Sequence, residues 1–188
     1  MASIAPFLFG KLPAHGDFVS RGLEDGERAA WDRWASAAME TLGDDDAHGQ
    51  VPPWRFIVGP SALGQGWRVG ALAPSIDRAE RRYLAVMGLG GLSASAAAGI
   101  GLAAASAIEG LLYQAIGERL TAEAAILDLD RCARSLSDEM LLAEALGAQP
   151  GADGLWWTEA DPRACRTGAS PPAADLLVAF RREAFHAD

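Results

Sequence analysis

The sequence feature that most restricts the fold is a run of 21 residues without a charged side chain, from Gly88 to Ile108. A run of this length is long enough to suggest a transmembrane helix. Its residues are mostly Ala, Gly and Ser, which contribute little to membrane insertion, and its large apolar residues are Leu89, Leu92, Ile100, Leu102 and Ile108. We therefore expect the end of a buried strand followed by a tightly packed helix, and no membrane span.

Apolar residues that alternate with polar ones predict the strands. Residues 54–58 alternate in this way, and two further strands are expected at 67–73 and 83–89. Because no helix separates these three strands, antiparallel neighbours are favoured. Shorter strands are predicted at 7–9, 18–20, 155–158 and 165–167.

Helical spacing of apolar residues predicts four helices. The first spans 24–42, with Trp31 and Trp34 on one face and Gly43 as its end. The second spans 95–120, the third is capped by Ser135 and ends at Gly147, and the last begins at Ser170. The residues expected in the core are Trp54, Phe56, Val58, Ile108, Leu112 and Phe180.

This order of elements predicts a mixed α/β chain of the α+β class, in which strands cluster and helices pack on them. We expect one domain over residues 1–188, with a mostly antiparallel central sheet of about five strands. Half of the residues are hydrophobic, which is a composition that can fill such a core.

The net charge and the cysteine content argue against some classes of function and indicate the kind of compartment. The formal net charge of −9 argues against binding to nucleic acid, which requires a basic surface. Two cysteines, Cys132 and Cys165, are too few for a disulfide framework and fit a reducing compartment. The N-terminal residues contain no cationic stretch typical of a secretory signal.

Residues 10–22 form a turn in which glycines and a proline fix the backbone and four side chains can carry charge: Lys11, His15, Asp17 and Arg21. His15 and Asp17, with Ser20, could be the parts of a small hydrolase or transferase. An extended segment points successive side chains away from each other, so a triad within it is disfavoured, and the enzyme is kept as the alternative.

A second polar segment, residues 77–82, contains Asp77, Arg78 and Arg81. Its charges either pair with one another and with solvent, or one of its arginines meets Asp17 of the opening turn. The guanidinium group suits carboxylate binding, so we predict that Asp17 lies within about 6 Å of an arginine of this segment.

Two adjacent tryptophans, Trp156 and Trp157, must point to opposite faces of a strand. We expect at least one of them to leave the main core and to lie either under a helix or at the surface, where an exposed tryptophan is a common interface anchor. The histidines and cysteines do not fall at metal-ligand spacing, and neither a phosphate-binding loop nor a dinucleotide fingerprint is present. The sequence thus predicts no metal and no cofactor.

Four motifs in order resemble the signature of the TagF family, which is associated with bacterial type VI secretion. They are Gly10-Lys11-Leu12-Pro13 with Gly16-Asp17-Phe18, Pro53-Trp54-Arg55-Phe56, Pro74-Ser75-Ile76-Asp77-Arg78 with Arg81, and Leu155-Trp156-Trp157-Thr158. The chain departs from the family pattern at Ala14, where a serine is usual. It also lacks a glycine and a second proline of the third motif.

The resemblance implies a longin-like fold and a non-catalytic cytoplasmic regulator that restrains assembly of the secretion system after translation. It implies action through binding to the forkhead-associated scaffold protein of that system. The residues that would contact this partner or maintain the signature are Lys11, His15, Asp17, Arg21, Asp77, Arg78, Arg81, Trp156 and Trp157. Of these, Lys11, Arg21 and Trp157 are the expected contacts.

Overall fold

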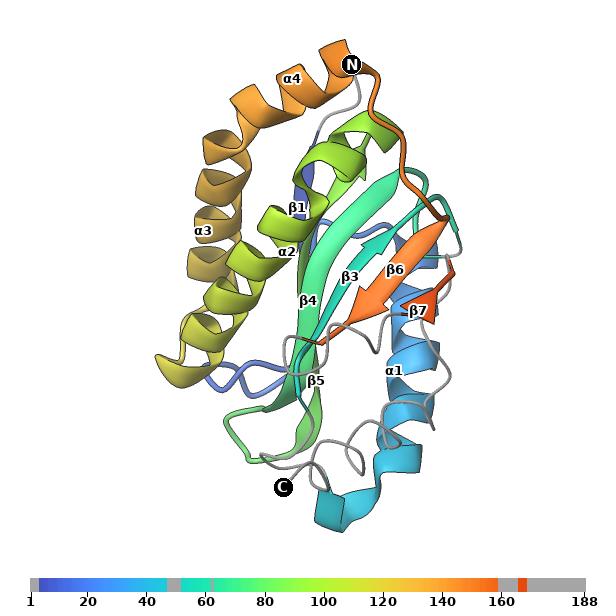
Figure 1. The fold of residues 1–188 in the computed structure, drawn as a ribbon. Coiled ribbons are helices and arrows are strands. Elements are labelled where there is room, and N and C mark those ends of the chain that lie inside the picture. Colours follow the sequence, from blue (N-terminus) through green and yellow to red (C-terminus); the bar gives the residue numbers. More distant parts are fainter. Residues whose placement is uncertain (1–3, 47–51, 62, 159–165, 169–188) are drawn as a thin grey trace, which may run out of the picture.

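The computed structural model describes residues 4–46, 52–61, 63–158 and 166–168. Its centre is a seven-stranded sheet with the order β2-β1-β5-β4-β3-β6-β7, in which every neighbouring pair is antiparallel (Figure 1). The strands are β1 (Ala5–Gly10), β2 (Val19–Arg21), β3 (Trp54–Val58), β4 (Trp67–Ile76), β5 (Arg82–Leu92), β6 (Gly154–Trp157) and β7 (Arg166–Thr167).

Helices cover both faces of the sheet. The helix α1 (Asp25–Asp46) lies on one face, and α2 (Ala94–Gly117), α3 (Ala122–Ser135) and α4 (Ser137–Leu146) lie on the other (Figure 1). Among these, α2 crosses the central strand β4, whereas α3 packs on β1. The mixed α+β fold with an antiparallel sheet is thus confirmed.

The sheet is wider than the predicted five strands because the short edge strands join it. The two-residue β7 pairs with β6, and the three-residue β2 pairs with β1. The central β4 and β5 also extend beyond the predicted ends, to Ile76 and Leu92. The predicted pairing partner Cys165 lies outside the described residues.

The face under α1 is aromatic. Trp31 of α1 lies with its ring centroid 5.6 Å from that of Phe56, and Phe56 stacks on Trp156 at 5.0 Å. The alternation predicted for β3 is confirmed, since Trp54, Phe56 and Val58 are completely buried on this face. An aromatic layer of this kind contributes specific edge and stacking contacts beyond the burial of apolar area.

The face under α2 is built from smaller residues that let the helix approach closely. Gly101 lies against Ile57, where an added Cβ would come within 2.4 Å of the isoleucine side chain. Gly99 meets Ala143 of α4 at a similar distance. Ile108 and Leu112 are buried here as expected, whereas Phe180 lies outside the described residues.

The uncharged run is a strand end followed by a helix, as predicted: β5 ends at Leu92 and α2 begins at Ala94. By length and composition alone, α2 could span a membrane. Half of its most apolar window is buried against the protein, which is the arrangement of a core helix.

Of the two alternatives expected for the adjacent tryptophans, a place under a helix or a place at the surface, the structure shows the first. Trp156 is 1 % exposed in the cluster under α1, and Trp157 is 8 % exposed in the cluster under α2. The two side chains do point to opposite faces, but both faces are covered by helices. Trp157 is therefore a core residue and not a surface anchor.

The helix boundaries differ from the predictions in two places. Helix α1 continues through Gly43 to Asp46. Residues 122–135 form α3, a helix that was not predicted, and Ser135 is its last residue and does not cap the next one. The predicted helix from Ser170 lies outside the described residues.

Two ion pairs are buried in the cores. Arg55 on β3 donates from Nε to Glu109 Oε2 of α2 at 2.6 Å, with side chains 13 % and 5 % exposed. Arg68 on β4 pairs with Glu27 of α1 at 2.5 Å. Each pair links the sheet to the helix above it. Neither was predicted, because the partners are far apart in the sequence.

Candidate functional site

Two polar loops meet at one end of the sheet. The first follows β1 and the second joins β4 to β5. Because β1 and β5 are antiparallel neighbours with Gly10 opposite Ala85, the end of one strand lies beside the start of the other. The Lys11 N–H donates to Leu84 O at 3.1 Å, and the Arg78 N–H donates to His15 O at 2.7 Å.

Gly10 is required where the first loop leaves the sheet. Its φ is +114°, and an added Cβ would lie 1.9 Å from Leu84 O. No residue with a side chain fits there without moving the neighbouring strand. The glycine at the head of the sequence motif thus serves the close approach of β1 and β5.

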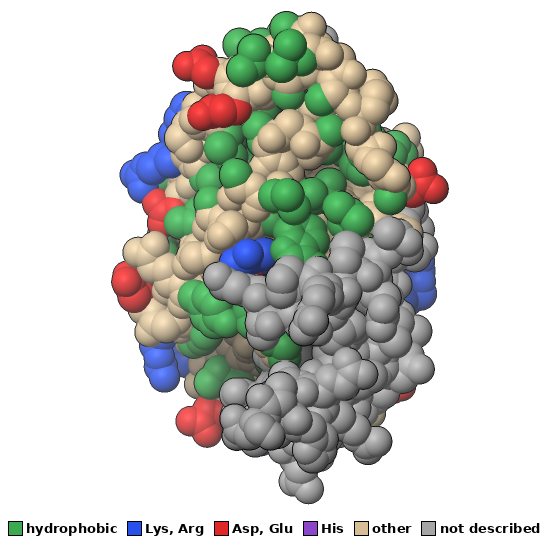
Figure 2. Space-filling view, in the orientation of Figure 1, with side chains coloured by type: hydrophobic (Ala, Val, Ile, Leu, Met, Phe, Trp, Pro, Cys, Tyr) green, Lys and Arg blue, Asp and Glu red, His purple; other side chains and the backbone are tan. Residues whose placement is uncertain are grey.

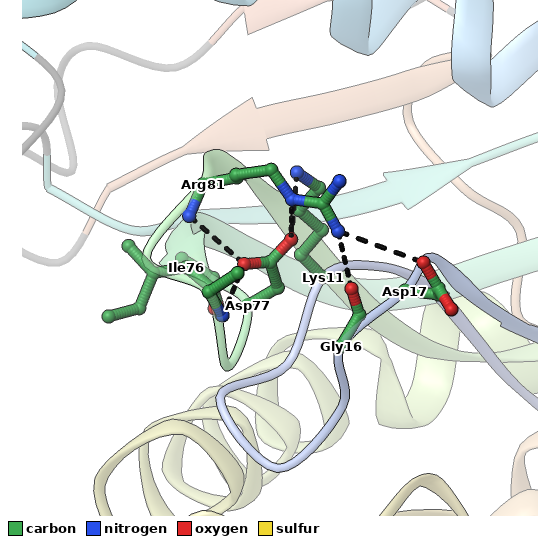
Figure 3. Close-up of polar contacts among 8 residues, drawn as sticks. Lys11, Gly16, Asp17, Ile76, Asp77 and Arg81 are labelled. Atoms are coloured by element: carbon green, nitrogen blue, oxygen red, sulfur yellow. Dashed lines mark hydrogen bonds and ion pairs between the residues drawn. The ribbon is translucent and has the colours of Figure 1, made fainter.

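Asp77 is the centre of the contacts between the loops (Figure 3). Its buried carboxylate accepts from the N–H groups of Ala79 at 2.9 Å and Arg81 at 3.0 Å. Its Oδ2 also accepts from Arg81 Nε at 2.8 Å and lies 3.1 Å from Lys11 Nζ. One carboxylate therefore folds its own loop and attaches it to the loop after β1.

Burial alone would raise the pKa of Asp77. Hydrogen bonds from the Arg81 N–H, the Lys11 ammonium, the Arg81 guanidinium and the Ala79 N–H outweigh that effect and lower the pKa to about 2. The carboxylate is thus charged over the whole physiological pH range. The fully buried Asp77 is a structural residue, and Lys11, whose side chain is 14 % exposed, belongs to the same contact.

Asp17 meets Arg81 as predicted, but at the surface. Its Oδ1 lies 3.7 Å from Arg81 Nη2, and its side chain is completely exposed. The same Arg81 nitrogen donates to Gly16 O (Figure 3). Arg81 therefore bridges the buried Asp77 and the exposed end of the first loop. The exposed ion pair itself contributes little to stability.

His15 holds the start of α3. Its Nε2 accepts a hydrogen bond from the Ala122 N–H at 2.8 Å. This N–H is one of the first-turn donors that have no partner inside the helix. The role of His15 was not predictable while α3 was unrecognised.

Replacing His15 with alanine is expected to lower the free energy of unfolding by about 0.5–2 kcal/mol, the usual range for losing a capping group. His15→Gln should recover most of the loss, because its Oε1 can reach the same N–H. Thermal denaturation of the three proteins measures the effect. Equal loss in both variants would mean that the hydrogen bond to Ala122 does not stabilise the helix.

An aromatic group adjoins the loops on the α1 side. The half-exposed Phe18 lies edge to face with Phe9 at 4.8 Å and with Tyr83 at 4.9 Å between ring centroids. Tyr83 donates to Asp32 Oδ1 of α1 at 2.9 Å. Burial and the neighbouring Asp32 raise the pKa of Tyr83 to about 12. The hydrogen bond with Ser36 acts in the opposite direction but does not outweigh them. Phe18 and Tyr83 were not predicted as site residues.

Arg21 lies apart from this contact, on the α3 side. It donates to Glu123 Oε1 at 2.7 Å, and both side chains are exposed. The hydrogen bond from Arg21 is the main cause that lowers the pKa of Glu123. Arg78 is also exposed, and its guanidinium lies close to the Cα of Gly16.

The loops do not assemble a catalytic group. His15 Nε2 is occupied by a backbone N–H, and the Asp17 carboxylate faces Arg81. Within the described residues, no group of three or more His, Cys, Asp or Glu side chains is placed to hold a metal ion. What the arrangement offers is a rigid surface with Asp17, Phe18 and Arg81 exposed on it.

Comparisons with known proteins agree with this fold. A family model described as "TagF N-terminal domain, Type VI secretion system-associated" matches residues 8–132. The crystal structure of PA0076 from Pseudomonas aeruginosa PAO1 is similar, with 25 % sequence identity and a TM-score of 0.67. The match covers 94 % of this chain and 93 % of that one. A search of curated proteins gave no match.

Proposed function

The chain belongs to the TagF N-terminal domain family of type VI secretion system-associated proteins, and from this premise we propose that it is a cytoplasmic, non-catalytic regulator of that system. In this proposal it restrains assembly of the apparatus after translation. It does so by binding the forkhead-associated scaffold protein of the system.

The observation that supports binding is the surface built by the two loops, which we call the loop surface: Asp17, Phe18, Arg78 and Arg81. Its backbone is held by the buried Asp77, so exposed side chains are presented in a fixed arrangement. Preorganised surfaces lose little entropy on binding. Phe18 supplies an aromatic group of the kind that dominates interface energies, and Arg81 a second anchor.

Charge would affect how fast the chain associates with its partner. The chain has a net charge of −9, whereas the loop surface brings two arginines together with the fully exposed Asp17. A partner with a basic patch beside an acidic group would match this pattern. Association would then be faster at low salt and slower at high salt.

A matched pair of charge reversals tests the surface. Asp17 and Asp25 both have nearly fully exposed side chains, and each makes one exposed ion pair with an arginine. Asp17→Lys is expected to weaken binding to the purified forkhead-associated protein by about tenfold or more, because it replaces an attraction with a repulsion at the interface. Asp25→Lys changes the net charge equally and should leave the affinity nearly unchanged.

The affinity is measured by titration calorimetry at fixed salt with the wild type and both variants. Equal effects of the two variants would show that net charge and not the loop surface determines binding. No binding of the wild type would contradict the proposed partner.

A further inference from the structure

Helix α4 is apolar on two faces. Met140 and Ala143 are buried on its inner face, whereas Leu141, Leu142 and Leu146 are 55 %, 59 % and 74 % exposed. Leu142 and Leu146 are neighbours along one side of the helix because they are four positions apart, and Leu141 adjoins Leu142. We call these three exposed side chains the leucine patch. Single exposed apolar residues are ordinary, but a contiguous group of them is typical of an interaction site.

A cavity of about 260 Å³ adjoins the leucine patch. Its large apolar lining residues come from α4, from the end of β5 and from the residue before β1: Met140, Leu141, Leu92 and Ile4. Glu144 lies at the same cavity, where its Oε1 accepts a hydrogen bond from Ser93 Oγ at 3.0 Å. An apolar cavity beside exposed leucines is the kind of pocket that receives an anchor side chain of a partner.

The leucine patch and the loop surface lie at opposite ends of the sheet. Because Ala5 pairs with Gly90 and Gly10 with Ala85, the start of β1 and the end of β5 share one end. The cavity beside α4 is at that end, since Ile4 lines it. The loops that follow Gly10 and precede β5 are at the other end (Figure 1). The patch is therefore separate from the surface to which we assign the proposed function.

The charged side chains of α4 are all acidic. Asp138, Glu139 and Glu144 are exposed, and the helix contains no lysine or arginine. Figure 2 shows apolar side chains gathered at the α4 end of the molecule, with acidic side chains next to them. The leucine patch thus has an acidic rim with no cation of its own helix to neutralise it.

This acidic rim argues against the occupants that the chain itself offers. A second copy would bring Asp138, Glu139 and Glu144 against the same residues, because a twofold contact uses one surface twice. Residues 169–188 contain two arginines against three carboxylates, and they follow β7, which is at the other edge of the sheet from β1 and β2. An anionic lipid surface would also be repelled.

We propose that the leucine patch and its cavity bind a basic amphipathic helix of a partner protein. Apolar side chains of that helix cover Leu142 and Leu146, and one of them enters the cavity beside Leu141. Lysines or arginines on its flanks meet the acidic rim. This is the helix-in-groove mode of recognition, and the ten residues of α4 provide a contact about 15 Å long. Opposite charge speeds association with a basic partner and disfavours acidic ones.

Fluorescence anisotropy of the full chain with labelled synthetic peptides tests the site. The probe is a peptide about five helical turns long, with leucines on one face and lysines on the other. A scrambled peptide of the same composition has the same charge but no apolar face, and it should bind at least about tenfold more weakly. A version with glutamate in place of lysine should not bind. Equal binding of the scrambled peptide would mean that net charge alone attracts the probe, and would overturn the proposal.

Exposed leucines on two helices provide matched variants. Leu142→Ser should weaken binding of the lysine peptide by about tenfold. Leu102→Ser should leave the affinity unchanged, because Leu102 is 65 % exposed but lies on α2, outside the patch. The double change Asp138→Lys with Glu139→Lys should weaken binding of the lysine peptide and permit binding of the glutamate peptide.

Three results would contradict the assignment to α4. They are equal losses from Leu142→Ser and Leu102→Ser, no binding of the lysine peptide up to about 0.5 mM, and a dimer in sedimentation equilibrium that Leu142→Ser abolishes. The last result would mean that a second copy covers the patch. Asp17→Lys should leave peptide binding unchanged, so the outcome here is independent of the loop surface.

Discussion

Asp77→Asn is expected to lower the melting temperature by about 10 °C and to loosen the two loops together. The buried carboxylate accepts from two backbone N–H groups and pairs with Lys11 and Arg81. An amide of the same shape provides one accepting atom and no charge, so Lys11 loses its partner. Calorimetry measures the melting temperature. Hydrogen exchange at the Ala79 and Arg81 amides, whose protons bind Asp77, measures the loosening.

Asp17→Asn is the matched control, because Asp17 contacts the same arginine but is fully exposed. It should leave both the melting temperature and the exchange rates close to those of the wild type. If the two variants behaved alike, Asp77 would not be the residue that holds the loops.

The difference between wild type and Asp77→Asn should depend on pH. The pKa of Asp77 in the folded state is about 2, below its ordinary value of 3.8. As the pH falls, the unfolded chain takes up the proton first, so the stability that Asp77 contributes is present above about pH 4 and is lost toward pH 2. The two melting curves should therefore lie apart at pH 7 and converge near pH 2.

Glu109→Ala is expected to lower the free energy of unfolding by about 3–5 kcal/mol, because it removes the carboxylate that Arg55 Nε contacts at 2.6 Å in a largely buried ion pair. The pair joins α2 to β3, and both side chains are largely buried. Urea denaturation measures the loss. The double change Arg55→Met with Glu109→Leu replaces the pair by apolar groups and should be within about 1 kcal/mol of the wild type.

Comparing the single change with the double change tests whether the ion pair is held in a dry core. A single change that costs less than about 1 kcal/mol, or a double change that costs as much as the single one, would mean that the pair is not held in a dry core.

The strands were predictable because their signal is local. Alternation in residues 54–58 identified β3 and its buried face, and all three residues of that face are buried. Helix α3 was missed although Thr121 caps it through the Ala124 N–H. Its buried residues, Ala122, Ala125, Leu129 and Ala133, have helical spacing, but three of the four are alanines, so the apolar pattern is weak.

The sequence predicted which residues belong to the site better than it predicted what each of them does. Sequence motifs drew attention to Asp17, Asp77 and Arg81. Both carboxylates contact Arg81 in the structure, but the local sequence does not indicate which of them is buried. Trp157 is buried because helices cover both faces of the sheet, and that arrangement is a property of the whole fold. Arg55 and Glu109 are 54 positions apart in the sequence, so no local pattern predicts their ion pair.

The most direct test of the central claim is export of the tube protein from a bacterium with an active type VI secretion system. Overproduction of the wild-type chain should abolish export and should capture the forkhead-associated protein in a pull-down. Asp17→Lys should allow export and lose the capture, whereas Asp25→Lys should act like the wild type. Unchanged export during overproduction of the wild type, with no capture of the forkhead-associated protein, would contradict the account.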